Sequence, residues 1–176
     1  FYAKASESLG NTSACSTISA SYTLDTVPPS LINLANDSTP RQSKTWNWDC
    51  SESPCTYLFA VDTVATTTPT GVYSSSTTVA QTSGTGTYYL HIIAKDAAGN
   101  TSAVAHYSAV LDNLAPATPT SITLINPSSS PGYVTTPTLR VGGVTTGDSI
   151  SIHTDSSCSS PALKASGTAT GTTIDL

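Results

Sequence analysis

One stretch of this chain occurs twice: Leu90-His-Ile-Ile-Ala-Lys-Asp-Ala-Ala-Gly-Asn-Thr-Ser-Ala103 has a second copy at Phe1-Tyr-Ala-Lys-Ala-Ser-Glu-Ser-Leu-Gly-Asn-Thr-Ser-Ala14. The two copies are 89 residues apart. After a slip of two residues the match continues to a Leu-Asp-x-x-x-Pro linker, which ends at Pro29 and at Pro116. The period of 87 residues between these prolines is the size of one small all-β module and far exceeds a solenoid turn.

The repeat divides the 176 residues into three parts. Residues 29–116 hold one complete module, residues 1–28 the last two strands of a preceding module, and residues 117–176 the early strands of a following one. The end parts are complementary, and open sheet edges attract whatever completes them. Two explanations stay open: the chain is a window of a longer tandem protein, or separate copies complete one another head to tail. About eight positions stay unfilled between the end parts, which favours the window.

The composition narrows the class of protein. Charged residues make up 10% of the chain, against roughly 25% in ordinary soluble domains. A surface wetted by Ser and Thr hydroxyls suits an extracellular location, and the net charge of −5 argues against binding to nucleic acid. No apolar run approaches the roughly 20 residues of a membrane-spanning helix. Since the chain has no Met and no basic, apolar leader, we expect any targeting peptide to lie elsewhere.

Short segments rich in Val, Ile, Thr, Tyr and Trp alternate with Gly, Pro, Asn and Ser, and none has a sustained helical period. This spacing predicts a β-sandwich of six or seven strands in the complete module. The expected strands cover residues 30–34, 44–49, 57–61, 75–80, 87–95 and 103–111.

Alternation with period two predicts the core of this module, because every second residue of a strand points to the same face. The turn between the last two strands contains Gly99 and Asn100, which are able to take the positive φ that a tight hairpin demands. The predicted core residues are Trp46, Trp48, Tyr88, Leu90, Ile92, Ala94, Ala105, Tyr107, Ala109 and Leu111.

These segments resemble the bacterial immunoglobulin-like tandem repeats of large secreted adhesins and surface fibres. The resemblance lies in Tyr88-Tyr-Leu-His-Ile-Ile-Ala-Lys-Asp-Ala-Ala-Gly-Asn100, in the linker Leu111-Asp-Asn-Leu-Ala-Pro116, and in the Cys-bearing segments 46–57 and 147–158. It implies an all-β fold of immunoglobulin-like β-sandwich modules in tandem, one complete and two partial, at the cell surface. It specifies a binding partner poorly, because such modules serve mainly as spacers.

The four cysteines favour an oxidising compartment. Cys50 and Cys55 flank a short polar loop, so we expect a local disulfide that stabilises the fold by about 2 kcal/mol. Zinc is the weaker alternative, since no second pair or nearby His completes a four-ligand set. A complete module separates Cys15 from Cys158, too far for a disulfide. We expect Cys158 to form a disulfide with the Cys15 position of the next copy along the series, and Cys15 to form one with the preceding copy.

No residue pattern points to catalysis, so we expect no enzyme activity. The three histidines, His91, His106 and His153, lie in separate strands, and no Gly-x-Ser-x-Gly segment presents a nucleophile. His91 and His106 fall on outward phases, where we expect exposed imidazoles. They are candidate cross-strand neighbours, but no carboxylate joins them at the spacing of metal ligands.

Calcium is the one ion that the resemblance suggests. In calcium-rigidified adhesin extenders, carboxylates of the linker and of the hairpin turn bridge consecutive modules, and the matching residues here are Asp25, Asp112 and Asp96, with Glu7 in place of the last in the first copy. Calcium takes six to eight oxygen ligands, of which these residues offer a part. The alternative is that each Asp merely begins a turn before Pro. We expect no other cofactor.

The sequence therefore predicts a structural segment of an extracellular fibre or adhesin stalk, whose partners are neighbouring copies of the repeat. The alternative is a carbohydrate- or protein-binding immunoglobulin-like module of a secreted surface protein, with a glycan or surface ligand on an exposed sheet face. An accessory domain of an enzyme is a third interpretation. We expect no nucleic acid partner and no membrane span.

Overall fold

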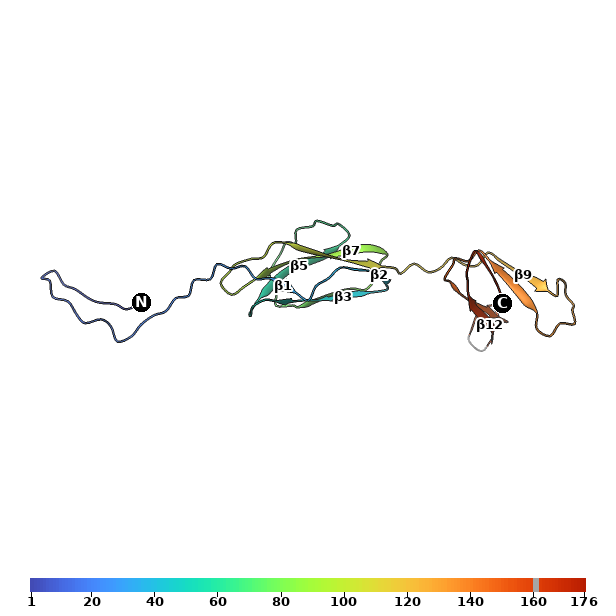
Figure 1. The fold of residues 1–176 in the computed structure, drawn as a ribbon, viewed down its shortest axis with the longest axis horizontal. Coiled ribbons are helices and arrows are strands. Elements are labelled where there is room, and N and C mark those ends of the chain that lie inside the picture. Colours follow the sequence, from blue (N-terminus) through green and yellow to red (C-terminus); the bar gives the residue numbers. More distant parts are fainter. Residues whose placement is uncertain (160–161) are drawn as a thin grey trace. The chain divides into compact units, whose positions relative to one another are not determined.

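The computed structural model describes residues 1–159 and 162–176. Its regular elements are all strands, so the chain is all-β (Figure 1). The chain divides into two compact units, Phe1–Asn113 and Leu114–Leu176. Among the described residues, no helix has the length and apolar character to cross a membrane.

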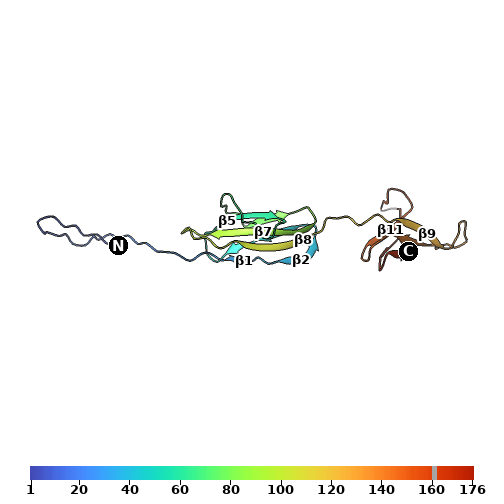
Figure 2. The same cartoon turned by 90° about the horizontal axis from the view of Figure 1, so that it is seen from above.

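Two layers of strands enclose the core of the first unit, which corresponds to the predicted complete module. One layer is a four-stranded sheet in the order β2-β8-β7-β5, whose strands lie side by side in Figure 2. The opposite layer holds the antiparallel pairs β1-β4 and β3-β6. The strands are β1 (Leu31–Ile32), β2 (Asp37–Arg41), β3 (Lys44–Asn47), β4 (Asp49–Cys50), β5 (Thr56–Asp62), β6 (Thr78–Gln81), β7 (Gly86–Lys95) and β8 (Ala105–Leu111).

The predicted core is confirmed. Trp48 packs edge-on against Tyr57 and Phe59, with ring centroids 5.9 and 5.0 Å apart. Such aromatic pairs stabilise the fold beyond the area that they bury. Among the predicted core residues, those that are buried are Trp46, Trp48, Leu90, Ile92, Ala94, Ala109 and Leu111, and those partly buried against them are Tyr88, Ala105 and Tyr107.

The edge strand β2 was not predicted from the sequence. Its residues are polar and include Pro40, which a central strand does not tolerate because Pro donates no ladder hydrogen bond. At the edge it pairs in parallel with β8. Asp37 holds the strand by accepting hydrogen bonds from Lys44 and Arg41, each at 3.0 Å. The bond from Lys44 contributes most to lowering the pKa of Asp37 to about 2.

The N-terminal hairpin has the same hydrogen bonds around its turn as the β7-β8 hairpin. Gly10 and Gly99 both have positive φ, 90° and 102°. Asn100 does not take positive φ, and its N–H donates to Asp96. The equivalent pairs, 89 residues apart, are the bridges Ser6–Thr12 and Lys95–Thr101, the bonds Glu7 N to Asn11 O and Asp96 N to Asn100 O, and the bonds Ser13 N to Ala5 O and Ser102 N to Ala94 O.

This first hairpin has the pairing of its counterpart but not the core. Phe1, Tyr22 and Leu24 are 82%, 73% and 71% exposed, whereas their counterparts Leu90, Ala109 and Leu111 are at most 2% exposed. None of its described residues belongs to a sheet of the complete module. Local hydrogen bonds therefore form without the apolar burial that stabilises most hairpins.

The second unit contains β9 (Ser121–Asn126), β10 (Thr138–Gly142), β11 (Ser149–His153), β12 (Leu163–Thr168) and β13 (Thr173–Asp175). Strand β10 pairs with β9 and with β13, and β11 pairs with β12. The buried core is small: Val141, Val144, Ile150 and Ala169. A hollow beside it is lined in part by Leu139, Ile152 and Leu176. In its described residues, this unit has no second antiparallel pair equivalent to β7 and β8.

Replacing Leu90 tests the importance of the β7 core face. We expect Leu90→Ala to lower the free energy of unfolding by about 2–5 kcal/mol, because the side chain is fully buried and leaves a cavity. Urea unfolding followed by tryptophan fluorescence measures this loss. The control Val72→Ala changes a side chain that is 90% exposed and should alter stability by less than about 0.5 kcal/mol. Equal midpoints for the two variants would contradict the assignment of the core.

Candidate functional site

Three carboxylates lie together at one end of the complete module. Oxygens of Asp25, Glu52 and Asp96 are all within 4.8 Å of one another. Asp25 belongs to the linker that leads into the module, Glu52 to the loop between β4 and β5, and Asp96 to the turn after β7. The structure thus brings together two of the three residues that the sequence predicted for calcium, and it adds Glu52, which was not predicted.

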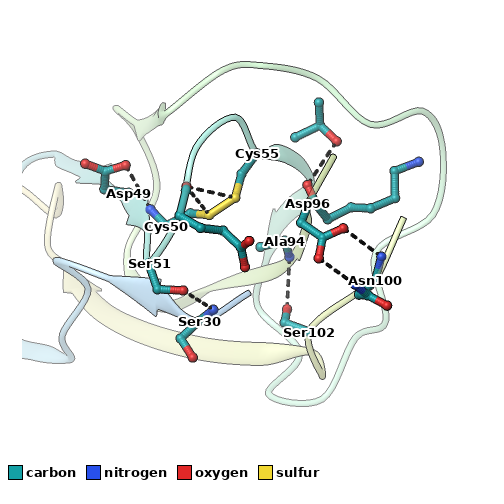
Figure 3. The surroundings of a disulfide bond; sticks show 12 residues. Ser30, Asp49, Cys50, Ser51, Cys55, Ala94, Asp96, Asn100 and Ser102 are labelled. Atoms are coloured by element: carbon teal, nitrogen blue, oxygen red, sulfur yellow. Dashed lines mark hydrogen bonds between the residues drawn. A yellow bond between two sulfur atoms is a disulfide. The ribbon is translucent and has the colours of Figure 1, made fainter. Parts of the chain in front are cut away.

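A disulfide fixes the loop that carries Glu52. Cys50 and Cys55 form the expected disulfide, with their Cα atoms 6.5 Å apart (Figure 3). Because both sulfurs are in this bond, they are not thiolate ligands of zinc. The same loop is tied to the start of the module, since Ser51 N–H donates to Ser30 O at 2.9 Å and Ser30 N–H donates to Ser51 Oγ at 3.0 Å. The cysteine pair is the signal that marks this loop in the sequence.

Asp96 organises the turn after β7. Its carboxylate is 6% exposed and accepts hydrogen bonds from Gly99 N–H at 2.7 Å, Asn100 N–H at 2.8 Å and the Asn100 amide at 2.8 Å (Figure 3). Burial acts to raise the pKa of Asp96, but these bonds outweigh it and the pKa is lowered. The Asn100 amide also donates to Asp25 O at 3.3 Å, so the same turn holds the linker.

Glu52 is the residue of this group whose pKa is raised. Burial is the largest cause, and the negative charges of Asp96 and Asp25 add to it. Three carboxylates in contact are the ligands that a hard cation such as Ca²⁺ prefers, and each offers one oxygen of the six to eight that the ion takes. The chemistry of the donor set therefore fits calcium, with Asp96 already held in place by its own hydrogen bonds.

Asp112 does not join this group. Its backbone N–H donates to Arg41 O at 2.9 Å, next to the end of β8. That end of the sheet is opposite the turn that carries Asp96, because β8 ends where the antiparallel β7 begins. Ten residues of β7 span about 30 Å, which no single ion bridges. Asp112 is instead the repeat equivalent of Asp25, in the following linker. In the first hairpin, Glu7 accepts a hydrogen bond from Asn11, as Asp96 does from Asn100.

Cys15 and Cys158 are exposed free thiols in the single chain. Cys15 follows the turn of the first hairpin, and Cys158 lies between β11 and β12. Their exposure leaves both sulfurs accessible to another molecule. Pairing of these cysteines with neighbouring copies stays a prediction.

The expectation of an exposed His91 was wrong. Its side chain is fully buried, whereas His106 is exposed as expected. The two rings are cross-strand neighbours, and a carboxylate does join them, since Asp62 Oδ1 lies 3.1 Å from His91 Nε2. The third histidine is separate: His153 contacts Ser159 O and Ser151 Oγ, both at 2.9 Å.

The neighbouring side chains explain this burial. The His91 ring stacks on Tyr89, lies edge-on to His106 with ring centroids 4.9 Å apart, and contacts Asp62 at the end of β5. The loop 63–77 pairs with the edge of β5, where Ser74 and Tyr57 exchange backbone hydrogen bonds of 2.7 and 2.8 Å. Within the same loop, the Tyr73 ring lies under the Lys95 ammonium, 4.5 Å from its centroid. Alternation along a strand predicts which face a side chain takes, but it does not predict what covers that face.

The chain matches no known protein-family model, no curated protein and no solved structure. What it does must therefore be inferred from its own geometry.

The raised pKa of Glu52 predicts a pH dependence. A carboxylate whose pKa is higher in the folded state than its ordinary 4.5 stabilises the fold below that value and loses this contribution as the pH rises through the folded-state pKa. We therefore expect the wild-type protein to lose stability relative to Glu52→Gln as the pH rises from about 4 to 7. Urea unfolding of both proteins across this range measures the difference. Glu7→Gln, outside the group, is the matched control. A difference that is constant or grows with pH would contradict the effect.

Proposed function

We propose that this chain is a structural, non-catalytic segment of an extracellular fibre or adhesin stalk built from immunoglobulin-like modules in series. One observation carries the proposal. The first hairpin reproduces the hydrogen bonds around the turn that joins β7 and β8, while its apolar side chains stay exposed. A hairpin of this kind is suited to complete a sandwich made by another copy of the repeat.

The strand order of the first unit supports an immunoglobulin-like arrangement. In such sandwiches the third, sixth and seventh strands form one sheet, and the first, second and fifth strands form the other. Here β5, β7 and β8 share one sheet, and β1, β4, β3 and β6 make the pairs of the opposite layer. The edge strand β2 runs parallel to β8, so the beginning of the chain contributes to both layers.

The second unit supports the same plan with two strands fewer. Strands β9, β10 and β13 pair as the first, second and fifth strands of a sandwich do, and β11 follows as the third. The strands that would come sixth and seventh are those that residues 1–28 resemble. A neighbouring copy, in the same or another polypeptide, supplies them. This contact is heterologous, so it continues in series without closing into a ring.

The outward sheet face also favours a structural role. A carbohydrate-binding module presents aromatic side chains on an open face, whereas Tyr89 on β7 is stacked on the buried His91 and the loop 63–77 pairs with the edge of β5. Tyr73, within this loop, already contacts Lys95. The low content of charged residues, 10%, likewise suits a surface that avoids polyionic partners.

We include calcium at the module junction in this proposal. The linker residue Asp25 and the module residues Glu52 and Asp96 are close enough to share one ion. Such an ion would relieve the repulsion that raises the pKa of Glu52 and would bind the linker to the module. The disulfide of Cys50 and Cys55 keeps Glu52 in reach, so it serves both stability and this junction.

The two exposed cysteines are part of this proposal. Both are free thiols in the single chain, so each can bond to another copy. Cys158 pairs with the Cys15 position of the next copy along, and Cys15 pairs with the preceding copy.

Association of the chain tests the completion of strands by a neighbour. We expect the mass measured by sedimentation to rise with concentration, in steps of the 18.0 kDa chain, because each free hairpin binds the second unit of another molecule. The double variant Phe1→Ser, Leu24→Ser removes apolar core-face side chains and should stay monomeric. Leu9→Ser, in the exposed hairpin turn, is the matched control and should associate like the wild type. A wild-type chain that is monomeric at every concentration would falsify this completion.

A calcium titration tests the junction. We expect Ca²⁺ to raise the thermal unfolding midpoint of the wild-type chain, because an ion that binds only the folded state stabilises it. Glu52→Gln should weaken the apparent Ca²⁺ affinity by roughly tenfold or more, since it removes a charged ligand. Asp112→Asn lies outside the group and serves as the control. The same Ca²⁺ response in the wild type and in Glu52→Gln would rule out this site.

A further inference from the structure

Three side chains form a hydrogen-bonded row across the outward face of the complete module. Asp62 ends β5, His91 lies in the middle of β7, and His106 is its cross-strand neighbour on β8. Asp62 Oδ1 is 3.1 Å from His91 Nε2, and His91 Nδ1 is 2.7 Å from His106 Nδ1. The row connects a carboxylate, a fully buried imidazole and an exposed imidazole in that order.

The carboxylate determines how the protons are arranged. Asp62 accepts a hydrogen bond, so His91 Nε2 carries the proton and His91 Nδ1 of the neutral ring presents its lone pair to His106. One proton then lies between the two Nδ1 atoms. The two imidazole nitrogens face each other as two metal ligands do, with a proton between them where a metal ion would bind.

Asp62 and Tyr89, which contact the His91 ring, hold it in place. Asp62 Oδ1 also accepts the Val64 N–H at 2.7 Å. The Tyr89 ring stacks on His91, with centroids 6.2 Å apart and planes at 23°. Ligating histidines are commonly oriented by a carboxylate on their other ring nitrogen in this manner.

The repeat does not keep a histidine at this position. In the first copy, the counterpart of His91 is Tyr2. A buried polar ring costs free energy unless it is fully hydrogen-bonded, and an apolar residue would avoid that cost. The histidine pair is thus a property of this module and not of the repeat.

We propose that His91 and His106 bind a divalent transition-metal ion such as Zn²⁺ between their Nδ1 atoms, with Asp62 orienting His91 from behind. Metal–nitrogen bonds of about 2.0–2.1 Å at a tetrahedral angle place the two nitrogens about 3.3 Å apart. The exposed His106 ring makes this adjustment by swinging outward while His91 stays fixed. Its proton moves from Nδ1 to the exposed Nε2, so both rings remain neutral ligands. Water supplies the remaining ligands.

This site is distinct from the carboxylate group at the module junction. Imidazole nitrogens select zinc, copper and nickel, whereas carboxylate oxygens select calcium and magnesium. The histidine pair lies on the face of the sheet and the carboxylates lie in the linker and the loops at one end. The metal proposal therefore holds or fails independently of the proposed function.

Nuclear magnetic resonance of the imidazole nitrogens tests the proposal with Zn²⁺ alone as the probe. In the wild-type chain we expect Zn²⁺ to shift the Nδ1 signals of His91 and His106 and to leave those of His153 unchanged. His106→Gln should abolish the Zn²⁺ shift of His91. Asp62→Asn should weaken Zn²⁺ binding by roughly tenfold or more, because it removes the carboxylate that orients His91.

Matched variants separate this site from other zinc ligands. His153→Gln and Glu52→Gln should bind Zn²⁺ like the wild type, since neither residue belongs to the row. Far-ultraviolet circular dichroism checks that His106→Gln, a change at an exposed side chain, keeps the fold. Unchanged Zn²⁺ affinity in a folded His106→Gln, or a Zn²⁺ shift confined to Nε2 of His106, would overturn the proposal.

Discussion

The antiparallel pairing of β7 with β8 organises this chain more than any other contact. On its inner face the pair supplies Leu90 and Leu111 to the core. On its outer face it brings His91 and His106 together. Its turn holds Asp96 beside the linker. Because side chains alternate along each strand, one register sets all of these positions at once, and a slip by one residue would reverse every one of them.

The first hairpin shows which features of the β7-β8 pairing are local and which need tertiary contacts. Its turn hydrogen bonds match those of the second copy because they depend on nearby residues, above all the Gly at positive φ and the side-chain bond from Asn11 to Glu7. Burial does not follow, since it needs a second layer of strands. Phe1 is therefore exposed although its counterpart Leu90 is not. The exposed apolar face of this hairpin is the physical basis of the proposed assembly in series.

The disulfide loop shows how a small covalent constraint serves a site. The bond from Cys50 to Cys55 closes a loop too short to add more than about 2 kcal/mol to stability. Its position matters more, because it holds Glu52 against Asp25 and Asp96. Burial, and after it the charges of Asp96 and Asp25, raises the pKa of Glu52. In the proposed calcium site, the cation offsets this repulsion and links the linker to the module.

The sequence by itself determined the all-β class, the repeat, the core face of the last two strands and the bond between Cys50 and Cys55, because these depend on alternation and on residues close along the chain. Only the tertiary structure decided the contacts between distant segments. The polar edge strand β2 gains its ladder from β8, Glu52 meets Asp96 across a loop, and His91 is buried where Asp62 and His106 contact it from the neighbouring strands. Each of these contacts needs a partner that is distant in the sequence. Alternation along a strand predicts which face a residue takes, but it does not predict what packs against that face.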